Sequence, residues 1–350
     1  MTESAVRSRW RLSRDRISFQ TIQTASVFLL LVVLCVISSL QVDTFFTWRN
    51  LVDNLLTGAS YIGVMACGMT LVMIAGGFDL SVASIVAVCS VITVMTLQGL
   101  ATAPVWVAVT GAILASAAVG TGLGAVNGTL VAYVGVNPFV VTLSTMLVFR
   151  GLALVITHGG QSIQTPLALG QAFRELYWGR VDLLGSGYRL TVPILVFLVI
   201  FIAFHVVLRY TRFGHYVYAV GGNETATWLA GINSARVKAI TYTLSGLTCA
   251  IAAAVYTGMS NTAQAASYQG LEMMVIAGVI VGGTPLGGGS GNLWYTLNGL
   301  LLLSVIENLL TQFGVTEEYR NIVRGMLILA VVAIDVSVRK RASVKGKVKA

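Results

Sequence analysis

A short polar break interrupts a long apolar stretch near residue 80. The sequence Gly76-Gly77-Phe78-Asp79-Leu80-Ser81 lies between apolar runs at 55–75 and 82–97, each close to the ~20 helical residues that cross a bilayer. Hydrocarbon provides no water for an unpaired backbone group or an ionised carboxylate. Such a break must therefore be buried in protein or face a solvated cavity, and we expect this one to line or gate a path across the membrane.

The composition places the chain among helical membrane proteins. Of its 350 residues, 56% are hydrophobic and only 10% are charged, whereas ordinary soluble domains carry about 25% charged residues. The 37 glycines and 5 prolines suit closely packed helices with occasional unwound turns better than the alternating strands of a β-barrel. We therefore predict an all-α polytopic membrane helix bundle.

Apolar segments of spanning length recur ten times along the chain. We predict spans near residues 24–40, 55–75, 80–98, 104–125, 138–157, 190–209, 238–258, 271–289, 292–311 and 321–338. The eighth segment is rich in glycine and is either spanning or re-entrant. Five spans in each half would allow an inverted repeat of five plus five, and a second glycine-rich break at 281–291 lies in the second half much as the first break lies in the first half.

Basic residues predict the orientation. They concentrate in the N-terminal arm, at both ends of a central loop and in the C-terminal tail. With an even number of spans, the positive-inside rule places all three clusters in the cytoplasm, which explains the formal net charge of +9 without a nucleic-acid partner. The predicted parts are a basic cytoplasmic arm at 1–23, a transmembrane domain at 24–338 that includes the cytoplasmic loop at 211–237, and a basic cytoplasmic tail at 339–350.

The central loop contains signals for a short helix. Asn223 suits the N-cap, Glu224 suits the first turn, and Gly231 suits the end of a helix of about two turns. Such a helix either lies in the membrane interface, as its Trp228 allows, or docks into another subunit. Glycines on both flanks would fix its angle, and this favours docking.

Polar and small residues within the spans leave further alternatives. Asn127 either holds helices together or contacts a polar solute, and Arg150 in the fifth span either snorkels or pairs with a carboxylate. Asn137, just before Pro138, suits a helix cap. Small residues at four-residue spacing along the fourth span favour close helix packing: Ser116, Gly120, Gly124 and Gly128.

The sequence shows no motif for nucleotide binding, metal binding or catalysis. The glycine-rich segment at 281–291 lacks the Gly-Lys-Ser/Thr ending of a nucleotide-binding loop. None of the three histidines has a carboxylate or a cysteine at the spacing of metal ligands. The sequence also contains no recognisable set of nucleophile, general base and orienting residue. We therefore predict neither an ATP site, a metal site nor enzymatic activity, and the energy for any transport would come from another subunit or an ion gradient.

Several motifs together resemble a known family. The segment 76–84 is similar to the signature Gly-Gly-Ile-Asp-Leu-Ser-Val-Gly-Ser, and only Phe78 and Ala83 depart from it. This signature belongs to the permease subunits of bacterial ABC importers of the ribose, xylose and autoinducer-2 class. These permeases form part of the branched-chain amino acid and ribose permease superfamily. At Asn308-Leu309-Leu310 the family's Asn-Gly-Leu is also altered. The resemblance covers roughly residues 50 to 335, and further similar motifs lie at 137–143, 150–151, 211–214, 219–226, 231–232 and 281–284.

This resemblance implies partners and residue roles. It implies a multi-pass protein of the bacterial inner membrane, surrounded by lipid, that works with a cytoplasmic ABC ATPase, a periplasmic solute-binding protein and a second permease copy, identical or diverged. ATP and Mg would bind to the ATPase, so this chain would hold no cofactor. The implied ATPase-coupling residues are Gly214, Gly221, Gly222, Asn223, Glu224, Ala226 and Gly231. The expected solute path or gate comprises Gly76, Gly77, Asp79, Ser81, Asn127, Asn137, Phe139, Gly282, Gly283 and Thr284.

Two function classes follow from these observations. The first is the permease subunit of an ATP-driven importer for a monosaccharide or similar small polar solute, which a path with few fixed charges would suit. The alternative is an ion-coupled secondary transporter or channel, in which Asp79, Glu272 or Glu307 carries a proton or a sodium ion. Their energy sources distinguish the two classes. A membrane-embedded enzyme is disfavoured because no catalytic constellation is present.

Overall fold

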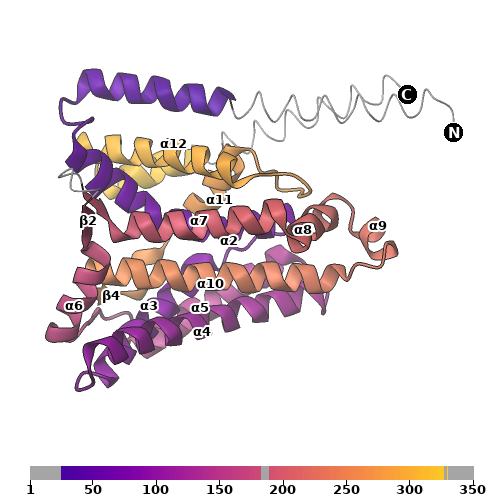
Figure 1. Ribbon diagram of the computed structural model, residues 1–350, viewed down its shortest axis with the longest axis horizontal. Coiled ribbons are helices and arrows are strands. Elements are labelled where there is room, and N and C mark those ends of the chain that lie inside the picture. Colours follow the sequence, from indigo (N-terminus) through magenta and orange to yellow (C-terminus); the bar gives the residue numbers. More distant parts are fainter. Residues whose placement is uncertain (1–24, 183–188, 327–328, 330–350) are drawn as a thin grey trace.

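The computed structural model describes residues 25–182, 189–326 and 329, and they form a bundle of helices that run mainly along its long axis (Figure 1). Among these residues, eight helical segments are long and apolar enough to cross a membrane. They are η1 (Arg49–Leu56) with α2 (Thr57–Ile74), α3 (Val82–Gly99), α4 (Val105–Ala132), α5 (Pro138–Ile156), α7 (Val192–Tyr210), α10 (Ser234–Ser260), η2 (Ala265–Tyr268) with α11 (Leu271–Gly282), and α12 (Leu293–Gln312). The all-α membrane fold is confirmed.

The eight segments correspond to the second through ninth predicted spans. The first predicted span is the shorter apolar helix Ala25–Gln41. Of the tenth, only 321–326 and 329 fall among the described residues, where they are helical. The predicted extent of the eighth span, 271–289, is wrong: α11 ends at Gly282, because Gly283 has a φ of +112° and the following glycines include three more in left-handed conformations.

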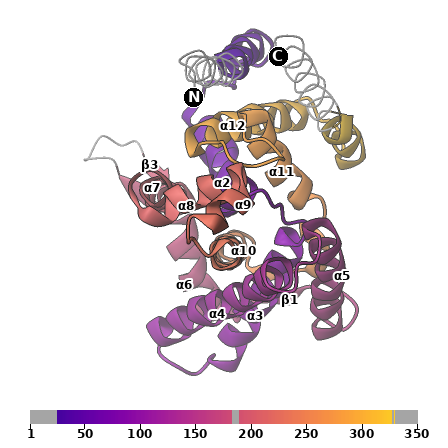
Figure 2. The same ribbon diagram turned by 90° about the vertical axis from the view of Figure 1, so that its right-hand side faces the viewer.

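The core forms where α2, α3, α10 and α11 meet (Figure 2). The stripe of small residues on α4 packs against α10, as the sequence predicts. A Cβ added at Gly120 would lie 2.6 Å from the carbonyl oxygen of Gly246, and one at Gly128 would lie 2.6 Å from that of Ala239. Glycine at these positions therefore lets the two helix backbones touch.

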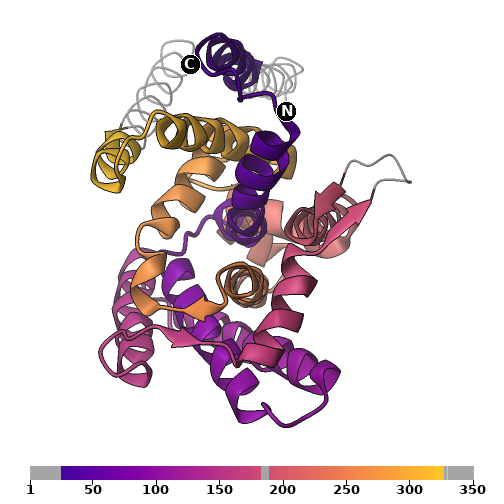
Figure 3. The same ribbon diagram turned by 90° about the vertical axis from the view of Figure 1, so that its left-hand side faces the viewer.

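The two ends of the bundle differ in structure. At one end, α7 is followed by α8 (Arg212–Gly222) and α9 (Glu224–Leu229), which precede α10. At the other end lie α6 (Leu167–Trp178) and two antiparallel strand pairs, as Figure 3 shows. β1 (Ile163–Gln164) pairs with β4 (Thr262–Ala263), and β2 (Arg180–Asp182) pairs with β3 (Arg189–Thr191).

The central loop holds two helices rather than the single short one that the sequence predicts. The predicted helix is α9: the Asn223 side chain accepts a hydrogen bond from the Ala226 amide at 2.9 Å, and Gly231 has a φ of +83°. The additional helix is α8, whose first turn is capped by the Thr211 hydroxyl, which accepts from the Gly214 amide at 3.2 Å. We refer to α8 and α9 together as the α8–α9 arm.

Candidate functional site

Three irregular or terminal segments meet at the α8 end of the bundle. They are the first break (75–81) between α2 and α3, the second break (283–292) between α11 and α12, and the C-terminal turn of α8. Most of the residues that the sequence assigns to a path or to coupling lie in these segments or beside them. The site is therefore built from both halves of the chain and from the α8–α9 arm.

Asp79, Ser81 and Asn127 form a fully buried polar cluster. The carboxylate oxygen Oδ1 of Asp79 accepts hydrogen bonds from the Ser81 amide at 2.8 Å and from the Ser81 hydroxyl at 2.6 Å. The Asn127 amide nitrogen donates to the same hydroxyl at 2.7 Å, so α4 is tied to the first break. Three residues that the sequence assigns to the path are thus brought together.

Two acceptors of this cluster remain open. Within the part of the chain that the structure describes, Asp79 Oδ2 and Asn127 Oδ1 are buried and have no hydrogen-bond partner. A buried acceptor without a donor costs about 1–3 kcal/mol. A water or a solute hydroxyl that reached the cluster would therefore be bound favourably.

The first break is held between α10 and α5. The Tyr242 hydroxyl of α10 donates to the Phe78 carbonyl at 3.1 Å, and a Cβ at Gly77 would lie 2.5 Å from that hydroxyl. The Phe139 ring of α5 lies 6.2 Å from the Phe78 ring, centroid to centroid. Asn137 is exposed and caps α5 by accepting from the Phe139 amide at 2.9 Å.

The end of α11, where the second break begins, packs tightly on the first turn of α12. An added Cβ at Gly282 would overlap the carbonyl oxygen of Tyr295, and Gly283 adopts a conformation that favours glycine. Thr284 is fully buried, and its hydroxyl has no partner among the described residues. A Cβ at Gly291 would lie 2.6 Å from that hydroxyl, so the break folds back over Thr284.

The two breaks and α8 touch through backbone atoms. The Gly289 amide donates to the carbonyl oxygen of Ile74 at 2.8 Å. An added Cβ at Gly221 would collide with the same carbonyl oxygen, and one at Gly288 would lie 2.6 Å from the Cα of Gly76. The sequence predicts Gly76 for the path and Gly221 for coupling, and the structure places them side by side.

Gly222 also lies at this contact, since a Cβ added at Gly289 would be 2.7 Å from the Gly222 Cα. The remaining predicted coupling residues lie farther along the arm. Gly214 packs against the last turn of α7, and Asn223 and Ala226 form the cap of α9. Glu224 forms an ion pair with Lys238 of α10, 2.6 Å from carboxylate oxygen to Nζ. This ion pair links the first turn of α9 to α10 at the surface.

Sequence reasoning missed two tyrosines and the later glycines of the second break. Tyr218 donates from α8 to the Gly291 carbonyl at 2.9 Å, and Tyr242 holds the first break. Nothing in the sequence marks these tyrosines, because their partners lie 73 and 164 residues away. Gly288 and Gly289 stand within the recognised glycine run, but their contacts depend on the tertiary fold.

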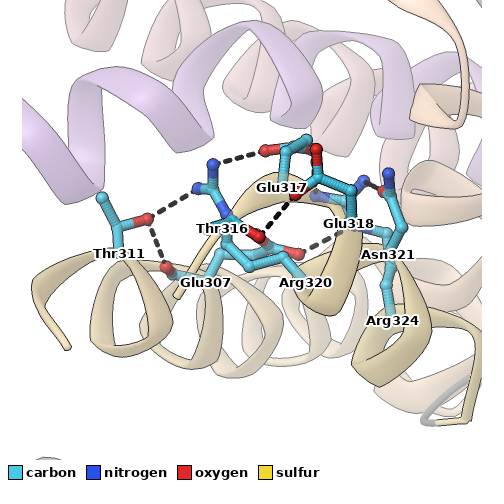
Figure 4. A network of polar contacts seen from close by, with 8 residues as sticks. All are labelled: Glu307, Thr311, Thr316, Glu317, Glu318, Arg320, Asn321 and Arg324. Atoms are coloured by element: carbon cyan, nitrogen blue, oxygen red, sulfur yellow. Dashed lines mark hydrogen bonds and ion pairs between the residues drawn. The ribbon is translucent and has the colours of Figure 1, made fainter. Parts of the chain in front are cut away.

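The carboxylates of the ion-coupled alternative differ in environment. Glu307 accepts from Arg324 at 2.8 Å, in a network that joins α12 to the helical residues 317–326 (Figure 4). Glu272 is buried, and one of its oxygens accepts from the Gly270 amide at 3.3 Å. Among the described residues, no group of three or more His, Cys, Asp or Glu side chains is placed to hold a metal ion.

Comparison with known proteins identifies relatives over nearly the whole chain. Residues 51–332 match the family described as branched-chain amino acid transport system / permease component. The ribose import permease protein RbsC of Escherichia coli K12 is 36% identical over 310 residues, which cover 89% of this chain and 92% of that protein. RbsC of Bacillus subtilis 168 is 37% identical over 326 residues, covering 92% and 96%. The L-arabinose transport system permease protein AraH of E. coli K12 is 34% identical over 312 residues, covering 88% of each.

Proposed function

Because the chain belongs to the family of branched-chain amino acid transport system permease components, we propose that it imports a monosaccharide or similar small polar solute as the permease subunit of an ATP-binding-cassette importer. It is a multi-pass inner-membrane protein. The relatives' names refer to ribose and to L-arabinose, and both are neutral, hydroxyl-rich solutes. A path with few fixed charges suits such solutes better than it suits ions.

The α8–α9 arm is the single observation that carries the coupling role. It extends from the end of the bundle (Figure 1) and presents two large apolar side chains, Trp228 at 67% and Leu229 at 73% exposure. We assign this arm to the cytoplasmic side, where the positive-inside rule places it together with both termini. There a partner ATPase would cover these side chains, and neither ATP nor Mg would bind to this chain.

Two further partners complete the proposal. A periplasmic solute-binding protein would deliver the solute to the end formed by α6 and the strand pairs. A second permease copy, identical or diverged, would complete the path. Lipid would cover the outward apolar faces of α5 and α7, which expose side chains such as Leu147 and Val199.

The buried polar cluster supports the assignment of the path. Asp79 Oδ2 and Asn127 Oδ1 are acceptors that receive no hydrogen bond from the described residues, and a sugar hydroxyl is a donor of the required kind. The neighbouring segments, Gly76 and Gly77 on one side and Gly282 to Thr284 on the other, would open or close access to them. Phe139 would contribute an apolar edge beside Phe78, and Asn137 would shape that edge by capping α5.

The ion-coupled alternative is weakened at one of its three carboxylates. Glu307 is engaged by Arg324 in an ion pair whose side chains are 18% and 19% exposed. A carboxylate held by a guanidinium in this way is less available to bind a sodium ion.

ATP hydrolysis by the complete assembly tests the proposal. The permease is purified with its ATPase and solute-binding protein, placed in lipid nanodiscs and supplied in turn with ribose, L-arabinose and xylose. We expect at least one sugar-loaded binding protein to stimulate hydrolysis. A rate of ATP hydrolysis that no sugar-loaded binding protein in the panel changes would contradict the proposal.

A substitution pair tests the role of the arm in the same assembly. Trp228→Ala should weaken ATPase binding, because it removes a large exposed apolar contact from α9. Trp106→Ala is the control: this side chain is 73% exposed, at the other end of the bundle on α4. Equal loss of ATPase binding in both variants would refute docking through α9.

A further inference from the structure

The last turn of α8 is wedged between the two breaks. A Cβ added at Gly221 would collide with the carbonyl oxygen of Ile74, the last residue of α2, and would lie 2.6 Å from the Gly289 amide nitrogen in the second break. At the neighbouring Gly222, an added Cβ would meet nothing within 4 Å. The steric requirement for glycine is therefore specific to Gly221.

The same place also joins the two breaks to each other. The Gly289 amide donates to the Ile74 carbonyl at 2.8 Å, and Gly288 lies against Gly76, where an added Cβ would be 2.6 Å from the Gly76 Cα. Three backbones from distant parts of the chain are thus in direct contact. We call this contact of Gly221, Ile74, Gly76, Gly288 and Gly289 the glycine joint.

One side chain extends the glycine joint. Tyr218, one turn before Gly221 on α8, donates its hydroxyl to the Gly291 carbonyl at 2.9 Å. Gly291 lies two residues before the start of α12. Through Gly221 and Tyr218, α8 thus contacts both the end of α2 and the approach to α12.

Contacts of this kind transmit displacement. A contact between side chains absorbs a small movement by changing rotamers, whereas backbone atoms in contact have no rotamers to change. Close-packed interiors are poorly compressible and transmit strain. A rotation or shift of α8 therefore has to move Ile74 and the second break together, and Ile74 is five residues before Asp79 of the polar cluster.

We infer that Gly221 and Tyr218 are positioning residues that convert movement of the α8–α9 arm into a joint movement of both breaks. This inference rests on the proposed function, since it assumes that an ATPase moves the arm. It adds the residues through which that movement reaches the path. Neither residue is required to touch the solute or the nucleotide.

A matched pair of tyrosines provides the test. Tyr218→Phe removes only the hydroxyl that reaches Gly291. Tyr216→Phe removes a hydroxyl from the same helix, where the side chain is exposed. Each variant is reconstituted with the ATPase and the solute-binding protein, and solute uptake and ATP hydrolysis are measured in the same liposomes. The readout is the number of solute molecules taken up per ATP hydrolysed, which a merely structural loss of folded protein would not alter.

We expect Tyr218→Phe to lower this ratio about five-fold, the effect of one net hydrogen bond on a conformational equilibrium, and Tyr216→Phe to retain it. Gly221→Ala should lower the ratio further, in a complex whose assembly is checked by size-exclusion chromatography. If Gly221→Ala does not assemble, the tyrosine pair alone decides.

The outcomes separate the two claims. A wild-type assembly without loaded-binding-protein stimulation of hydrolysis would overturn the proposed function itself. If the wild type is coupled but Tyr218→Phe and Tyr216→Phe take up the same number of solute molecules per ATP, the positioning role of the glycine joint is overturned. The proposed function would then still stand. An assembled Gly221→Ala with the wild-type ratio would do the same.

Discussion

Replacing Gly128 by alanine is the sharpest test of the packing between α4 and α10. The added Cβ would lie 2.6 Å from the Ala239 carbonyl oxygen and 2.9 Å from its Cα. Carbon atoms in contact prefer about 3.5–4.0 Å, so α4 would have to move away from α10 by about 1 Å. Overpacking of this kind costs about 1–3 kcal/mol. We therefore expect the free energy of unfolding to fall by that amount.

Gly122→Ala is the matched control on the same helix. Gly122 is exposed, and an added Cβ there would meet nothing within 4 Å. Alanine is favoured over glycine inside a helix by about 0.5–1 kcal/mol, so this variant should be neutral or slightly stabilised. Both free energies are measured by denaturing-detergent titration followed by circular dichroism. Equal effects of the two substitutions would refute close backbone packing between α4 and α10.

Three further substitutions have defined expectations. Asn223→Ala removes the α9 cap, at a cost of about 1 kcal/mol, and should accelerate hydrogen exchange of the first-turn amides of α9; unchanged exchange would refute the capping role. Tyr242→Phe removes the hydrogen bond to the Phe78 carbonyl and should lower the free energy of unfolding by about 0.5–1.5 kcal/mol. The same detergent titration measures this change, and a variant more stable than the wild type would contradict the prediction. Glu307→Gln removes the charge from the shorter of the two carboxylate contacts of Arg324, 2.8 Å to Glu307 against 3.7 Å to Glu317, and should cost roughly 1–3 kcal/mol, which thermal unfolding would detect; a variant as stable as the wild type would show that this ion pair adds nothing.

The sequence predicts the fold class and most spans because the length of an apolar segment can be read from consecutive residues alone. The break near Asp79 is visible for the same reason, since glycines and a carboxylate stand out against apolar runs. The extent of α11 is not visible in this way. The residues after Gly282 remain small and partly apolar, and only their left-handed conformations show that the helix has ended.

The arm shows a second limit of sequence reasoning. Asn223 marks α9 through a local capping signal, and the structure confirms it. The sequence does not predict α8, because its glycines at 214, 221 and 222 and its β-branched residues have low helix propensity. Its helix is supported by tertiary contacts with α2, α7 and α10, which a local pattern does not contain.

The sequence predicts parts of the candidate site but not how the parts meet. The sequence assigns Asp79, Ser81 and Asn127 to one path, and the structure places them in one hydrogen-bonded cluster. The contact between Gly76 and Gly221 does not follow from the sequence, which predicts the first residue for the path and the second for coupling. Glycine has no side chain to indicate a partner, so only the three-dimensional structure shows that these two roles meet.

The most direct test of the account is the energy source for uptake in proteoliposomes. The permease and its ATPase are reconstituted, the loaded solute-binding protein is added outside, and either ATP with Mg or an imposed proton or sodium gradient is supplied. We predict that the internal solute exceeds the external concentration only when ATP is hydrolysed. Accumulation driven by an ion gradient in the absence of nucleotide would contradict the account.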